Sequence, residues 1–364
     1  MYYIAVHYVK FINVMLIEKM FLEFNVHTTT KQKSESEKIQ WMKSIAIYNH
    51  SSLKKSIWQI LNTFIPYVAL WALMVWSIDI SYWLTLALVF PAAGFLVRIF
   101  IIFYDCGHGS FFKSQKANHI LDTMSGILAF TPYFEWRFEH GVHHATSGNL
   151  DRRGRGDVWT MTVEEYKAAS RFKRLMYRIY RHPFFMLVFG PIFSFLLVYR
   201  FPHRHAKKRE RWSVYYTNAA LLAILLIMGF TIGFKTYLLI QLPVLLLAGS
   251  AGIWLFYVQH QYEGVYWARH DKWDFMTAAL NGSSFYKLPH VLQWFSGNIG
   301  FHHIHHLNSR IPNYNLEKCH YNTPEFHTVH PITLAKSLKS LKFRLYDETE
   351  QKLVSFARLK SKTA

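Results

Sequence analysis

The chain has 364 residues, of which 51% are hydrophobic and 18% aromatic, and its formal net charge at pH 7 is +19. The hydrophobic residues gather in a few long blocks, a distribution typical of membrane proteins. A soluble protein with buried core helices is the alternative, but adjacent apolar runs of about 20 residues are too long for it. No recognised nucleic-acid motif accompanies the positive charge, so contact with anionic lipid explains the charge better than nucleic-acid binding does.

The N-terminal segment, residues 1–51, is expected to be a flexible extension. Its first 25 residues mix apolar side chains with Lys10, Glu18 and Lys19, and no small-residue cleavage site follows them. We therefore do not interpret them as a secretory signal peptide. An amphipathic surface segment or an upstream extension fits them, and "HTTTKQKSESEK" resembles a linker.

The first long apolar block begins at Ser56. No Lys or Arg occurs from there to Val97, and the one acidic residue is Asp79, near the middle. This pattern predicts two membrane-spanning helices, at about 57–77 and 80–103, joined by a tight turn.

A second block runs from Trp212 to Gln259, where the only charged residue is Lys235, again near the middle. It predicts a second helical hairpin, at about 214–233 and 237–259.

The distribution of basic residues predicts the orientation of these hairpins. Of the 41 Lys and Arg residues, 8 precede Ser56, 18 lie between Tyr104 and Ser213, and 13 follow Gln261. The positive-inside rule then places both termini and the central region in the cytoplasm. Cys106 and Cys319 would both face this reducing side, so no disulfide is expected.

Two further apolar stretches interrupt the central region. Residues 120–134 are short for a span and contain Asp122 and Pro132, which favours an interfacial or re-entrant helix. Residues 183–199 are long enough to cross, but crossing would place the basic "RFPHRHAKKRER" outside, so a segment at the inner face is preferred.

Histidine is the most informative residue type. The pattern H-x-x-H-H occurs twice, in "EHGVHHATSG" and in "GNIGFHHIHHLNS". Positions i, i+3 and i+4 of a helix lie on one face, so each triplet is expected to present its imidazoles to a common point. The two triplets consist of His140, His143, His144, His302, His305 and His306.

The two triplets predict a metal site, and His108 and His260 are expected to belong to it. His108 follows one apolar span and His260 ends another, on the same side of the membrane. Eight imidazoles exceed what one ion normally uses, which favours two metals. Imidazole suits zinc and copper as well as iron, so the ligand type alone does not select the metal. His303 lies between ligand positions and is expected to point elsewhere.

With these two H-x-x-H-H patterns, which we call histidine boxes, the sequence resembles the membrane fatty-acid desaturases, most closely the Bacillus-type acyl-lipid desaturases. The similarity covers about 52–358 and includes "DCGHGSFF", "HHATSGNLDRRGRGD", "IWLFYVQH", "GSSFYKLP" and "GNIGFHHIHHL". It implies an all-α integral membrane protein, with four transmembrane helices in two hairpins and a cytosolic helical cap that carries the histidine boxes. The expected domains are the extension, a desaturase domain at 52–345 and a basic tail at 346–364.

The resemblance also implies an activity. A di-iron centre, held by the eight histidines, would use O2 and two electrons to introduce a cis double bond into an acyl chain of a membrane phospholipid. Abstraction of hydrogen from a methylene group requires a stronger oxidant than any side chain, so no catalytic residue is expected beyond the metal centre. Trp136, Phe285 and Trp294 are candidates to line an acyl channel, although ordinary packing explains each of them equally well. The expected location is the bacterial plasma membrane, with the active site on the cytoplasmic side.

The chain has no dinucleotide-binding glycine fingerprint and no cysteine set for an iron–sulfur cluster, so electrons are expected from a partner. A small acidic donor of the ferredoxin or flavodoxin type would be attracted to the basic run at 203–211. Membrane anchoring by the same charges is the alternative.

One residue departs from the family pattern. The first box of the family is H-x-x-x-H, but this chain has Tyr104 at the first position and His108 at the second, in "YDCGH". Tyrosine can bind iron as phenolate, but it is normally neutral near pH 7. Three functions therefore remain open: a desaturase impaired to some degree by Tyr104, a hydroxylase or other oxygenase on the same scaffold, and an inactive lipid-binding homologue.

Overall fold

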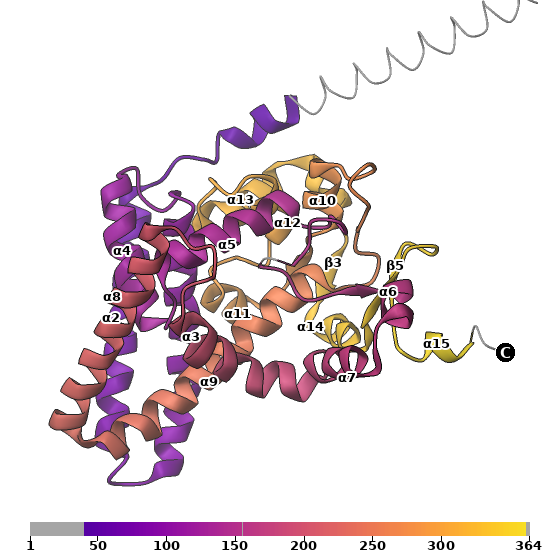
Figure 1. The fold of residues 1–364 in the computed structure, drawn as a ribbon. Coiled ribbons are helices and arrows are strands. Elements are labelled where there is room, and N and C mark those ends of the chain that lie inside the picture. The colour runs from indigo at the N-terminus through magenta and orange to yellow at the C-terminus, as the bar shows by residue number, and fades with distance from the viewer. Residues whose placement is uncertain (1–39, 155, 362–364) are drawn as a thin grey trace, which may run out of the picture. The chain divides into compact units, whose positions relative to one another are not determined.

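The computed structural model describes residues 40–154 and 156–361 (Figure 1). The chain divides into two compact units, Met1–Ile47 and Tyr48–Ala364. In the first unit, the described residues 40–46 are helical. The predicted surface segment and linker lie outside the described residues.

The first predicted hairpin consists of α2 (Leu53–Ser77) and α3 (Tyr82–Gly107). At about 1.5 Å per residue each helix is about 37 Å long or more, enough to cross the hydrocarbon of a bilayer. Arg98 of α3 donates from Nε to the hydroxyl of Thr63 in α2, over 3.1 Å. A buried guanidinium thus has a polar partner between the two helices.

A second long helical stretch follows the central region, and its three segments adjoin one another without a break. It consists of α8 (Lys208–Met228), the π-helical η4 (Gly229–Gly233) and α9 (Phe234–His260). Both of its ends lie against one short helix, α5 (Tyr133–Thr146). Ser213 Oγ accepts a hydrogen bond from the backbone N–H of Glu135, over 3.3 Å. The Nε2 atom of His260 is 3.1 Å from that of His143.

These contacts require the stretch to fold back on itself. A straight helix from 213 to 260 would measure about 70 Å, whereas α5 is about 21 Å long. The reversal lies at η4, where Gly233 has φ 90°, a conformation that favours glycine. Figure 1 shows α8 and α9 running to this turn and back. The two segments therefore form the second predicted hairpin.

By length and composition, three helical stretches of the described chain could cross a membrane. They are Leu53–Ser77, Tyr82–Gly107 and Lys208–His260. A fourth candidate is the pair Arg171–Tyr180 and Phe185–Arg200, whose parts meet at an angle of 69°. This bent pair contains the apolar stretch expected at the inner face, and it consists of α7 (Arg171–Tyr180), the π-helical η1 (Phe185–Phe189) and η2 (Ile192–Leu197), and the 3-10 helix η3 (Val198–Arg200).

The largest apolar core joins the two hairpins. Buried side chains of α3 pack there with buried side chains of α9, so apolar burial holds the two helices together. The buried residues that α3 and α9 contribute are Val89, Ala92, Ala93, Leu96, Val97, Ile99, Ile240, Val244 and Ala248.

The remaining elements are short. The helices are α4 (Gln115–Leu128), α6 (Val163–Ala168), α10 (Phe275–Asn281), α11 (His290–Phe295), α12 (His302–Leu307), α13 (Asn313–Asn322), α14 (Leu334–Ser337) and α15 (Arg358–Ser361), with the 3-10 helices η5 (Pro324–Thr328) and η6 (Leu338–Lys342). The strands are β1 (Met161–Thr162), β2 (Phe285–Lys287), β3 (Pro331–Thr333), β4 (Leu345–Asp347) and β5 (Lys352–Val354).

The strands form two small sheets. β4 lies between β1, to which it is parallel, and β5, to which it is antiparallel, while β2 and β3 form a parallel pair. The protein is thus mostly helical, as expected, but strands of two or three residues are too short to leave a periodic signal in the sequence.

A buried hydrogen-bonded pair fixes the end of α3 to the C-terminal half of the chain. Asp105, 1% exposed, accepts two hydrogen bonds of 2.7 Å at Oδ2, from the backbone N–H and the side-chain amide of Asn313. The first histidine box is thereby held against α13, which follows the last box.

We expect Asn313→Ala to lower the free energy of unfolding by about 1–3 kcal/mol, because it leaves a buried carboxyl with one donor fewer. Thermal unfolding in detergent would measure the effect. Asn322→Ala, an exposed position on the same helix, is the control. Equal melting temperatures for the two variants would contradict this role of Asn313.

Candidate metal centre

The structure brings all eight predicted histidines together. They come from four places: the residue that caps α3, the helix α5, the last residue of α9 and the helix α12. Their ring nitrogens form two groups, and within each group one nitrogen per residue lies within 4.8 Å of the others. The first group is His108, His140, His144 and His305, and the second is His143, His260, His302 and His306.

The expectation that each triplet converges on one point is wrong. On α5, His140 and His144 join the first group while His143 joins the second. Neighbouring residues of a helix point about 100° apart, whereas residues i and i+4 lie nearly one above the other. Each H-x-x-H-H box therefore supplies an i, i+4 pair to one group and a single histidine to the other.

The nitrogen spacing in the first group fits metal ligands. His144 Nε2 lies 3.0 Å from the Nε2 atoms of both His140 and His305. Two nitrogens about 2.1 Å from one ion, at angles of about 90–109°, are about 3.0–3.4 Å apart. Four neutral imidazoles at this distance can each offer a lone pair to one cation.

Hydrogen bonds in the second group strengthen this argument. His143 Nδ1 lies 2.6 Å from a carboxylate oxygen of Asp157, and His260 Nδ1 lies 3.2 Å from the carbonyl oxygen of Gly282. Both Nδ1 atoms must carry a hydrogen to make these bonds, so in the neutral rings both Nε2 atoms are lone-pair acceptors. These two acceptors face each other over 3.1 Å, an arrangement that a cation between them satisfies.

Burial keeps six of these imidazoles neutral. It lowers the pKa values of His140, His144, His302, His305 and His306 well below the ordinary range, and neighbouring histidines lower them further. The pKa of His108 falls to about 3, chiefly through burial. Metal ions bind the neutral form of imidazole, so these six rings are in the protonation state that binding requires.

Tyr104 lies beside the first group. Its ring centroid is 4.6 Å from that of His140, 4.7 Å from that of His305 and 5.2 Å from that of His108. Its hydroxyl is buried and forms no hydrogen bond within the part of the chain that the structure describes. The phenol thus faces a ligand-rich site without a polar partner.

His303 belongs to neither group. Its Nε2 lies 3.3 Å from His320 Nδ1, and its ring packs against Phe285 and Phe326. Burial lowers the pKa of His303 to about 3, so this ring is also neutral.

Asp157 is a functional candidate that the sequence analysis missed. It is in "DRRGRGD", where Gly154 and Gly156 both have positive φ and turn the chain back toward α5. A Cβ atom at Gly156 would lie only 3.0 Å from the Cβ of His143 and from the carbonyl oxygen of Glu139. The glycine spacing was a usable signal for a carboxylate placed behind a histidine.

An apolar cavity of about 220 Å³ opens onto the first group. Tyr104, Trp136 and His140 line it, together with side chains of α3, α9 and the segment before α8. Trp136, one of the three candidates to line an acyl channel, lines this cavity. Phe285 does not: it stacks on Phe301.

The other expected channel residue, Trp294, packs away from this cavity. Its ring lies under the guanidinium of Arg98, 3.9 Å from ring centroid to Cζ, and against Phe95.

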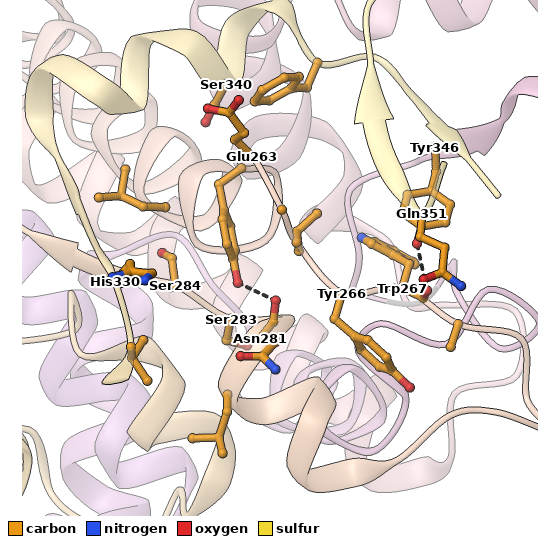
Figure 2. Close-up of a pocket in the computed structure, with 18 of the residues that line it drawn as sticks. Glu263, Tyr266, Trp267, Asn281, Ser283, Ser284, His330, Ser340, Tyr346 and Gln351 are labelled. Carbon is orange, nitrogen blue, oxygen red and sulfur yellow. Dashed lines mark hydrogen bonds between the residues drawn. The ribbon is translucent and has the colours of Figure 1, made fainter. Parts of the chain in front are cut away.

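A second, larger cavity of about 1190 Å³ is lined by the loop that follows α9 and by residues around β3 (Figure 2). Its wall includes Ser283 and Ser284, next to the Gly282 carbonyl that bonds His260. Tyr262 and Tyr346 also line this cavity, and their hydroxyl groups donate hydrogen bonds to backbone carbonyl groups. Charged residues of both signs line this cavity, so it is polar where the first is apolar.

Comparison with known proteins identifies the family of this chain. The family model for fatty acid desaturases matches residues 81–334, a range that includes every histidine of both groups. The chain belongs to the fatty acid desaturase family. It is accordingly an O2-dependent oxidoreductase, and the membrane-associated character of the family agrees with its long apolar helices.

Individual relatives support this assignment. A fatty acid desaturase of Bacillus subtilis is 49% identical over 331 residues, which cover 91% of this chain and 94% of that protein. An sn-1 acyl-lipid omega-3 desaturase (ferredoxin) of Synechocystis sp. is 28% identical, covering 60% of this chain and 62% of the relative. An omega-3 fatty acid desaturase of the endoplasmic reticulum from Vigna radiata is 26% identical, with 77% and 71% covered.

We expect Asp157→Ala to weaken metal binding about 10- to 100-fold, because the carboxylate orients His143 and makes its Nε2 a better ligand. Competition between the purified protein and a chelator for Fe²⁺ would measure it. Asp271→Ala, at an exposed position, is the control. Unchanged affinity in Asp157→Ala would show that the carboxylate has no such role.

Proposed function

We propose that this desaturase introduces a cis double bond into a saturated acyl chain of a membrane lipid, at a di-iron centre held by the two histidine groups. The observation that carries the proposal is the pair of four-histidine groups beside an apolar cavity. When bound, iron would supply the activation of O2 that no side chain can provide.

The residues around the cavity would position the substrate. A saturated chain has no polar group along its length, so shape and packing must place it. Leu96, Phe100, Leu245 and Phe256 contribute apolar walls, and Tyr104 and His140 of the first group also line the cavity. Water would be excluded from the reacting carbons by the same walls.

We propose that four helices, α2, α3, α8 and α9, span the membrane with both termini in the cytoplasm. The distribution of Lys and Arg supports this topology, since the two hairpin turns hold only Lys235 between them. The histidine groups would then lie at the cytoplasmic face, and the bacterial plasma membrane is the proposed location.

We further propose that a ferredoxin- or flavodoxin-type protein supplies the electrons. The name of the Synechocystis relative includes ferredoxin. In this chain the basic run at 203–211 reaches α5, where the guanidinium of Arg209 lies 3.8 Å over the ring centroid of Phe134. An acidic donor attracted to this surface would dock close to the helix that carries three of the histidines.

The central test is iron content and acyl-chain products measured on the same preparations. We expect about two irons per chain and new cis-alkenes in the lipids of expressing cells. His305→Gln should lose both, whereas His303→Gln, the matched control in the same helix, should keep both. Equal loss in the two variants would contradict the ligand assignment, and hydroxylated chains without new alkenes would favour the oxygenase alternative.

Position 104 gives a second test. A neutral phenol binds iron less well than imidazole, and the metal would have to promote its ionisation. We therefore expect Tyr104→His to raise iron occupancy and desaturation together. If a fully metallated wild-type protein gains nothing from this substitution, Tyr104 does not limit the centre.

A further inference from the structure

A series of aromatic side chains leads from the first histidine group toward the protein surface. The ring of Trp136 stacks on that of His140, with centroids 4.5 Å apart and planes 14° apart. Phe103 contacts Trp136 at 4.6 Å and Tyr133 at 6.4 Å. Tyr133 and Trp136 are three residues apart on α5 and therefore lie on neighbouring positions of one helix face.

The series of aromatic side chains ends at Tyr133, whose phenol lies beside a proton acceptor, His119. The Tyr133 oxygen lies 2.7 Å from His119 Nδ1, and Arg137 donates to the same oxygen over 3.1 Å. Arg137 donates to the phenol oxygen, and the phenolic hydrogen can in turn be donated to His119 Nδ1 in the tautomer that carries its own hydrogen on Nε2. Tyr133 is 1% exposed, whereas His119 is partly exposed and can exchange protons with water.

The neighbouring groups are in the states that this contact needs. Partial burial and the charges of Arg137 and Arg209 lower the pKa of His119, so its ring is neutral at pH 7 and can accept a proton. Burial raises the pKa of Asp122, next to Tyr133, to about 9. Asp122, which also lies at the Tyr133 hydroxyl, is therefore protonated and is not a base for the phenolic proton.

An oxidant able to remove hydrogen from a methylene group is also able to oxidise tryptophan and tyrosine. When no acyl chain fills the cavity, Trp136 is the ring stacked on a ligand of the centre and exposed to that cavity. Tyr104 is closer to the group, but its hydroxyl has no hydrogen-bond partner in the described chain and thus no proton acceptor. Tyr133 is the phenol that can lose its electron and proton together.

We propose that Trp136 and Tyr133 form a relay that supplies one electron to the oxidised metal centre when substrate is absent, while the Tyr133 proton passes to His119. The proposal rests on the proposed di-iron function. Trp136 first gives one electron to the centre and becomes a cation radical. Tyr133 then gives one electron to Trp136 and its phenolic proton to His119 Nδ1. The products are a centre reduced by one electron, neutral Trp136, a neutral Tyr133 phenoxyl radical and protonated His119.

The test is rapid mixing of the reduced, iron-loaded protein with O2 in the absence of acyl lipid, followed by freeze-quench electron paramagnetic resonance. We expect a phenoxyl signal in the wild type and its loss in Tyr133→Phe, which keeps the ring and removes only the hydroxyl. Tyr177→Phe is the matched control, because Tyr177 is a fully buried, hydrogen-bonded tyrosine that does not belong to this series of aromatic side chains. The Tyr177→Phe variant should give a phenoxyl signal equal to that of the wild type.

A second measurement follows the consequence of the relay. After repeated exposure to O2 without lipid, peptide mass spectrometry should find more oxidation at the metal-binding histidines in Tyr133→Phe than in Tyr177→Phe. A phenoxyl signal that persists in Tyr133→Phe, or an iron-loaded wild type that makes alkenes but never gives the radical, would overturn the relay and leave the proposed function intact. A wild type that binds no iron would overturn both.

Discussion

The constraint on which the structure depends is the complete or partial burial of eight imidazoles in two groups, within each of which one nitrogen per ring lies within 4.8 Å of the others. Buried polar groups need partners, and rings such as His143 and His260 face each other with acceptor atoms. A cation in each group is the natural partner. The fold must therefore hold four separate segments at fixed distances, and its apolar helices provide the frame.

The frame acts through long-range contacts rather than through local helix stability. α12 has six residues, too few for a stable isolated helix, yet it carries three of the eight rings. It is held by the backbone bond from His303 to Ser284 and by the packing of Phe301 on Phe285. The pair of Asp105 and Asn313 fixes the neighbouring α13 to the first box. The last box is thus positioned by tertiary contacts on both sides.

The sequence predicts those parts that local chemistry determines. His108 and His260 could be placed because each stands where an apolar helix ends, and both hairpins follow from long apolar runs with a single charged residue near the middle. Contacts between distant segments leave no such signal. The Asn313 amide on Asp105 and the pairing of strands of two or three residues depend on chain reversals that no local pattern encodes. The carboxylate of Asp157 behind His143 is different, because the glycines before it are a local signal of a turn. The expected domain limits and the roles of the histidines remain predictions.

The two histidine groups are not equivalent, which bears on where chemistry would occur. In the second group, Asp157 and Gly282 fix two of the rings through their Nδ1 atoms. The first group opens onto the apolar cavity and is bordered by Tyr104 and Trp136. We infer that an acyl chain would meet the first group, and that the second serves more as a rigid support. The tyrosine in the first box therefore stands on the side where substrate, oxidant and aromatic relay would meet, so its effect should extend beyond metal affinity to the reaction itself.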